Sequence, residues 1–172
     1  MTDELPDAVA QAFDHHDAYE RTEDGSYRLT TTVFDGRVTA EDAEEWRTSY
    51  TVTVRAPTLH AATEDDVGDA VADGWFETLE LRLEDAPKAT RADVELDAFS
   101  VERDGEDVVT TYEFTLGSAD RAADVAKAFV EYVEGTYVEG IVPGYSYEGK
   151  VADLVSDASS GGGEGEVGGT PL

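Results

Sequence analysis

WRTSYTVTVRAP, residues 46–57, is the most regular stretch of this sequence. Its side chains alternate between two sets, and a period of two places such sets on opposite faces of a strand. One set is Trp46, Thr48, Tyr50, Val52 and Val54, and the other is Arg47, Ser49, Thr51, Thr53 and Arg55. We expect a strand that packs the first set on a core and exposes the second to water, and that ends at Pro57.

Upstream of this strand, the sequence predicts a helix and another strand. Apolar side chains recur at helical spacing over residues 5–16, which predicts the helix. The residues that share its inner face are Leu5, Val9, Ala12, Phe13 and His16. After a turn at residues 23–25, alternation returns over residues 27–34 and predicts the strand.

A hairpin is expected between these two regions. Asp35-Gly36 is a dipeptide favoured in two-residue hairpin turns, because both positions need a positive φ. It would pair Val33 with Val38 on a short strand at residues 37–40.

Downstream, the sequence predicts a helix over residues 63–83, where Thr63 and Asp66 resemble a capping box. One apolar stripe on it holds Val67, Ala70, Val71, Gly74 and Leu81, and Trp75, Phe76, Leu79 and Leu83 extend the stripe sideways. This arc is wider than a helix lying singly on a sheet requires.

Two more strands follow at residues 93–103 and 108–116, joined by an Asp-Gly turn at Asp104. Their alternation goes out of phase near Ala98, and we expect a β-bulge there. The bulge would set Leu96 opposite Tyr112 and Val94 opposite Phe114.

The C-terminal part predicts a third helix that Ser118 caps. Its inward residues are Ala122, Val125, Ala126, Phe129 and Val133. Pro143-Gly144 then turns the chain, and residues 145–158 form an extension of one or two helical turns.

This element order, α-β-β-β-α-β-β-α, indicates an α+β fold, a two-layer sandwich in which helices cover an antiparallel sheet. Residues 1–158 form one domain, and residues 159–172, SSGGGEGEVGGTPL, a flexible Gly-rich acidic tail. Over residues 4–138 the order resembles that of small type III secretion chaperones and YbjN-like proteins, a resemblance that does not by itself fix a function. Segments 27–37, 50–59 and 141–145 look like those of a family of uncharacterised haloarchaeal proteins, a resemblance that implies no activity and no site residues.

The charge of the chain is its most unusual property. Forty acidic residues face 12 basic ones, for a net charge of −28. In molar salt the Debye length falls to about 3 Å, which screens such repulsion. The composition is therefore typical of a halophilic protein, and we expect a cytoplasmic one. Nucleic acid is excluded as a partner, because phosphate binding needs clustered Lys and Arg.

The sequence contains no cysteine, so thiolate metal sites and disulfides are excluded. The N-terminal residues lack the pattern of a signal peptide, and no apolar run reaches the roughly 20 residues that span a bilayer. We therefore expect no membrane association.

Candidate chemistry is sparse. His15-His16-Asp17 is the clearest metal candidate, but adjacent helical side chains diverge by about 100°. The pairs Glu44-Glu45 and Asp65-Asp66 are expected by chance in so acidic a chain. We predict no catalytic, metal or cofactor site, and no cofactor.

Two functional hypotheses remain. The wide arc of the second helix, at Trp75, Phe76, Leu79 and Leu83, packs on the third helix or forms a surface for a second copy or another protein. If the arc is a surface, the protein is a non-catalytic protein-binding or chaperone-like module, and the resemblance to type III secretion chaperones, which form homodimers through the corresponding helix, implies a possible homodimer. The alternative is an enzyme or small-molecule binder with a pocket between sheet and third helix, lined by Tyr50, Tyr112 and Tyr137.

Overall fold

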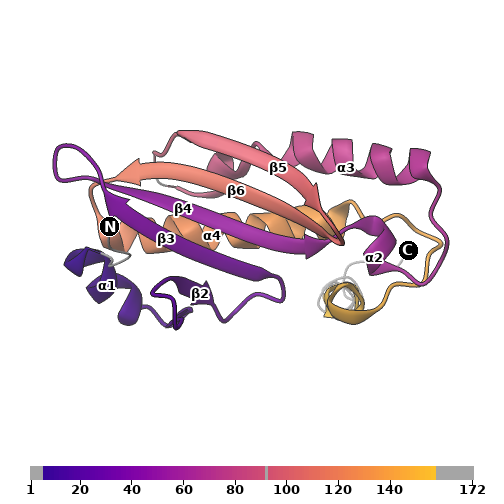
Figure 1. Ribbon diagram of the computed structural model, residues 1–172, viewed down its shortest axis with the longest axis horizontal. Helices are drawn as coiled ribbons and strands as arrows, with labels where there is room; N and C mark the ends of the chain where they lie inside the picture. Colours follow the sequence, from indigo (N-terminus) through magenta and orange to yellow (C-terminus); the bar gives the residue numbers. More distant parts are fainter. Residues whose placement is uncertain (1–5, 92, 158–172) are drawn as a thin grey trace, which may run out of the picture.

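The computed structural model describes residues 6–91 and 93–157. Its centre is a six-stranded antiparallel sheet in the order β1-β2-β3-β4-β6-β5 (Figure 1). The strands are β1 (Tyr19–Arg21), β2 (Tyr27–Leu29), β3 (Asp35–Asp42), β4 (Thr48–Pro57), β5 (Ala98–Asp104) and β6 (Asp107–Leu116). The helices are α1 (Asp7–Asp14), α2 (Leu59–Ala62), α3 (Asp69–Leu83), the 3₁₀ turn η1 (Ala86–Ala89) and α4 (Ala119–Glu139), and residues 149–157 are helical as well.

The helices pack on one face of the sheet, and the predicted α+β fold is confirmed. Side chains of β4 and β6 that face α4 are buried, and the ring of Phe129 on α4 lies 4.9 Å from that of Tyr112 and 5.5 Å from that of Phe114. Between them, residues such as Thr51, Thr53 and Thr111 point to the uncovered face and are partly exposed. The result is a dry face under the helices and a wet face rich in hydroxyl groups.

The central strands follow the predicted alternation. Tyr50 pairs with Phe114 and Val52 with Tyr112 across β4 and β6. The prediction for Trp46 is wrong, because β4 begins at Thr48 and the Trp46 side chain is 96% exposed. It belongs to the loop that joins β3 to β4.

The predicted hairpin at Asp35-Gly36 is also wrong. Both residues lie within β3, and Val38 pairs with Tyr27 instead of Val33. The first hairpin joins β2 to β1, a three-residue strand that the sequence did not reveal.

Gly36 has a packing role in place of a turn role. A Cβ atom at this position would lie 2.7 Å from Cγ1 of Val130 on α4. Glycine is therefore required for the close approach of α4 to the sheet. The same helix holds the segment before β3, since Oε2 of Glu134 accepts a hydrogen bond of 2.7 Å from the amide of Phe34.

The predicted helix over residues 63–83 is divided in two. Thr58 caps the short α2, and Thr63 leaves the helix to form a bridge with Tyr147. Helix α3 then begins after Gly68 without a side-chain cap. Its buried residues are Ala72, Trp75, Leu79 and Leu83, whereas Val71 and Leu81 of the predicted stripe are exposed.

Strand β5 pairs without interruption from Ala98 to Asp104, and the predicted β-bulge lies directly before it: the amide of Asp97 donates a hydrogen bond of 2.7 Å to the carbonyl of Glu113, the residue that pairs with Ala98. Phe99, and not Leu96, lies opposite Tyr112. The change of phase near Ala98 arises because Asp97 and Ala98 both face Glu113, and Val94 is buried ahead of them. The turn to β6 is shifted by one residue, because its central positions are Gly105 and Glu106.

The C-terminal helix is confirmed. Oγ of Ser118 accepts a hydrogen bond from the amide of Arg121, and all five predicted inward residues of α4 are buried. The predicted turn at Pro143-Gly144 and the helical extension are present, and Val151 packs in the core. The predicted tail at residues 159–172 lies outside the described residues, as does the predicted boundary at residue 158. No described helix combines the length and apolar character that crossing a membrane requires.

Two glycine-to-alanine substitutions should have opposite effects on stability. We expect Gly36→Ala to lower the free energy of unfolding by about 1–3 kcal/mol, because its methyl group meets Val130. Gly74→Ala in α3 should raise it by about 0.5–1 kcal/mol, since no atom lies within 4 Å of the new Cβ. Urea unfolding in one buffer measures both. If Gly36→Ala is as stable as the wild type, or if Val130→Ala does not rescue it, the close-contact explanation fails.

Glu134 should make stability depend on pH. Burial raises its pKa above the ordinary 4.5, and the hydrogen bonds from the Phe34 and Val33 amides only partly offset this. A raised pKa stabilises the folded state at low pH, and this contribution is lost as the pH rises through the folded-state pKa. We expect the wild type to lose stability relative to Glu134→Gln over that interval, and the difference to level off above it. Urea unfolding of both proteins from about pH 4 to pH 8 tests this, and a constant difference would contradict it.

Candidate functional site

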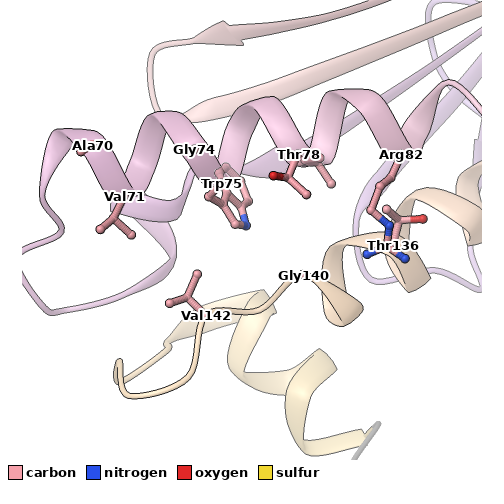
Figure 2. A pocket seen from close by; sticks show the side chains of 10 residues that line it. Ala70, Val71, Gly74, Trp75, Thr78, Arg82, Thr136, Gly140 and Val142 are labelled. Atoms are coloured by element: carbon pink, nitrogen blue, oxygen red, sulfur yellow. The ribbon is translucent and has the colours of Figure 1, made fainter.

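An apolar groove of about 300 Å³ lies between α3 and the chain that follows α4 (Figure 2). We call it the α3 groove. Its lining residues are Ala70, Val71, Gly74, Trp75, Thr78, Leu79, Arg82, Thr136, Gly140 and Val142. Figure 2 shows the side chains of Trp75 and Val142 directed toward each other across the hollow.

The groove results from small residues on one side of α3. Ala70, Gly74 and Thr78 recur every four residues and therefore lie on one face of the helix. Gly74 leaves open space where other residues would carry a side chain. From position 70 to position 82 this face extends for about 18 Å, at a rise of 1.5 Å per residue.

Trp75 forms the rigid floor of the groove. Its ring stands edge-to-face on that of Tyr137, with 5.5 Å between centroids, and only 8% of the residue is exposed. The hydroxyl of Tyr137 donates a hydrogen bond of 2.9 Å to the carbonyl of Pro57, which fixes the ring on β4. The floor is therefore pre-formed and does not depend on a ligand.

Arg82 is the charged residue of the lining, and it closes one end of the groove. Its guanidinium is ion-paired with Glu139 at the end of α4. The same side chain borders a second hollow of about 340 Å³, which Tyr132 and Gly135 also line. The Arg82–Glu139 pair thus lies between two hollows, and it is exposed enough for solvent and salt to weaken it.

Two of the four predicted interaction residues line the groove, and the other two lie outside it. Trp75 and Leu79 line the α3 groove. Leu83 is fully buried, and its carbonyl accepts a hydrogen bond of 2.7 Å from the Tyr112 hydroxyl. Phe76 is half-buried beneath the guanidinium of Arg103, 4.4 Å from its ring centroid.

Sequence reasoning missed the part of the groove that contains no large side chain. Gly74 was counted in an apolar stripe, and Thr78, Arg82 and Val142 were not identified. The regular spacing of Ala70, Gly74 and Thr78 was the available signal, because small residues at helical spacing leave a furrow. Val142 carried no local signal.

The tyrosines of the expected pocket under the sheet are core residues. Tyr50, Tyr112 and Tyr137 are each at most 1% exposed. The ring of Tyr50 stacks on that of Phe114 at 5.4 Å, and that of Tyr112 packs on Phe129. Burial raises the pKa of all three hydroxyls above the ordinary value of 10.0, so they stay protonated at neutral pH. Side chains fill the space in which that pocket was expected.

The histidine and carboxylate candidates do not converge. Nε2 of His16 lies 2.9 Å from Oδ1 of Asp124, whereas Nδ1 of His15 lies 2.7 Å from the carbonyl of Gln11. Asp65 accepts a hydrogen bond from the amide of Ser146 and so fastens the C-terminal extension. Within residues 6–91 and 93–157, no group of three or more such side chains could hold a metal ion.

A second surface feature is the turn between β3 and β4, residues 43–47, which we call the Trp46 tip. The amide of Arg47 donates a hydrogen bond of 3.2 Å to the carbonyl of Glu44. The two central residues, Glu45 and Trp46, have φ values of 59° and 64°. Two positive φ values describe a type I′ turn, which Asn-Gly normally occupies. Glu and Trp are strained in this conformation. The indole of Trp46 is exposed to solvent at this turn.

Comparison with known protein families gives a match that includes both the α3 groove and the Trp46 tip. The model of a family described as "Family of unknown function (DUF5813)" matches residues 14–157. The chain belongs to this family. No curated protein and no solved structure matches it.

Membership in DUF5813 confirms the expected assignment to an uncharacterised family. The matched residues include the α3 groove and the Trp46 tip, and the family description assigns no activity to either. Haloarchaeal origin and the YbjN-like topology stay predictions.

Relief of the strained turn should stabilise this DUF5813 protein. We expect the double substitution Glu45→Asn, Trp46→Gly to raise the free energy of unfolding by about 1 kcal/mol or more, because both new residues accept a positive φ. Urea unfolding measures the change, and Arg47→Ala, just beyond the two central positions, serves as a control. An unchanged or lower stability would show that the turn is not strained.

Proposed function

We propose that this DUF5813 protein is a non-catalytic protein-binding module whose α3 groove receives an apolar side chain of a partner. The carrying observation is the groove itself: a pre-formed apolar furrow, open to solvent and formed by small residues of one helix. Exposed apolar hollows of this kind are typical of protein interaction sites.

The size of the groove supports this proposal. An apolar cavity of about 150 Å³ accepts benzene, so 300 Å³ accommodates a large side chain such as Leu, Phe or Trp. The same volume is at the lower limit of small-molecule sites, which span about 300–1,000 Å³. An elongated groove of modest volume suits a side chain that arrives on a polypeptide.

The chemistry of the lining argues in the same direction. A catalytic pocket needs convergent polar groups, and here the lining offers two threonine hydroxyls and the paired Arg82. Groups with shifted pKa values serve the fold instead: Glu134 anchors the Phe34 amide, and the tyrosine hydroxyls bond to backbone carbonyls at Leu83 and Pro57. The lining supplies affinity for apolar atoms and no acid–base pair.

Fluorescence of Trp75 provides a direct test. The chain has two tryptophans, so the variant Trp46→Ser leaves Trp75 on the groove floor as the sole reporter. In molar KCl, we expect a short peptide with one central Leu or Phe to change this emission saturably. The same peptide with Ser at its centre should have no effect.

The matched control is a second variant that fills the groove. Gly74→Leu, introduced beside Trp46→Ser, should abolish the response, whereas Glu80→Leu on the exposed side of α3 should preserve it. If no apolar peptide alters Trp75 emission, the proposal is refuted. If free aromatic molecules bind and peptides do not, the small-molecule alternative replaces it.

A further inference from the structure

Among the described residues, the α3 groove is an open apolar hollow and Trp46 is the most exposed large apolar side chain. We infer that the groove of one copy of this chain receives the Trp46 tip of a second copy, in a head-to-tail contact. This inference rests on the proposed function and names the partner of the same groove.

Trp46 has the properties of an interface anchor. It is 96% exposed, so burial would remove nearly its whole surface from water. Tryptophan is among the residues that most often dominate binding energy at protein interfaces. Its φ of 64° is strained for a tryptophan at the end of a hairpin, and backbone strain of this kind clusters at functional sites.

The groove matches an indole in size and character. Its 300 Å³ is twice the volume that holds one benzene ring, and an indole consists of two fused rings. Its floor is the Trp75 ring, and aromatic pairs are stabilised by offset or edge-to-face contact. Gly74 lets the incoming ring approach the backbone of α3.

The positions of the two features require two copies. The loop between β3 and β4 lies at the left end of the molecule in Figure 1, and α3 extends toward its right end, along the longest axis. A chain therefore cannot place its own tip in its own groove. Joining different surfaces of two copies is a heterologous contact, which continues into a ring or a filament until it closes.

The contact between two copies should depend on ionic strength, because charged residues lie at both surfaces. Glu44 and Glu45 flank the indole, and Arg82 closes the groove, so a tip carboxylate can replace Glu139 as the partner of Arg82. Each copy nevertheless carries a net charge of −28, and two copies repel each other at low ionic strength. Molar salt screens that repulsion beyond about 3 Å. Association should therefore strengthen as salt is added.

Light scattering in molar KCl tests the inference by complementation. The wild type should exceed the 18.5 kDa mass of one chain, whereas Trp46→Ser and Gly74→Leu should each remain monomeric. The Trp46→Ser chain keeps an intact groove, and the Gly74→Leu chain keeps an intact tip. An equimolar mixture of the two should form a heterodimer and nothing larger, because only one productive contact exists.

Control variants distinguish this contact from non-specific hydrophobic association. Leu81→Ser removes an exposed leucine of α3 outside the groove and should associate like the wild type. Trp46→Ser should weaken association about 30-fold or more, and Trp46→Phe substantially less. Circular dichroism verifies that each variant is folded, and a folded Glu80→Leu chain controls for the added leucine.

Three results would overturn the inference, and they differ in what they imply for the proposed function. A mixture that stays monomeric while apolar peptides still alter Trp75 emission leaves the groove to another protein. A mixture that stays monomeric without any peptide response removes the protein-binding proposal as well. Association of the wild type that Trp46→Ser does not weaken also overturns it, since the contact would then lie elsewhere.

Discussion

Close packing of α4 on the helix-covered face of the sheet determines where most of the other elements lie. Val130 reaches the backbone of β3 because Gly36 has no side chain, and Phe129 fills the space over β6. Around this contact, the hydroxyl of Tyr19 bonds to the carbonyl of Ala123, and that of Tyr132 bonds to the carbonyl of Arg82. The N-terminal hairpin and α3 are thus both fastened to α4. The α3 groove follows from this arrangement, since the end of α4 supplies its far wall.

Sequence patterns predicted the elements whose burial has a simple period. Strands β4 and β6 and helix α4 each bury one face, so alternation or helical spacing locates them. Gly36 was misread because a glycine that admits a neighbouring helix looks, in sequence, like a glycine that turns the chain. Trp46 was misread because the alternation of side chains extends to residues that precede β4. Only the backbone shows that the strand begins at Thr48.

The candidate site was predicted less well than the fold, for a physical reason. Local patterns report large buried side chains, and they identified Trp75 and Leu79 correctly as part of an apolar arc. A groove is defined by what is missing, here the side chain of Gly74, and by a wall from elsewhere in the chain, here Val142. Gly74 belongs only to a spacing of small residues at positions 70, 74 and 78, and Val142 belongs to no pattern. The strain of the Trp46 tip is likewise a property of dihedral angles that no residue pattern expresses.

The face of the sheet that no described helix covers has a consequence for how the charge of this chain can be altered. Thr51, Thr53 and Thr111 point away from the core, beside charged residues such as Arg55 and Glu113. Exchanges at such surface positions typically alter stability by no more than about 0.5 kcal/mol. Substitutions on this face can therefore change the net charge of the chain one residue at a time at little cost in stability. The helix-covered face offers no such freedom, because its side chains are buried in the core.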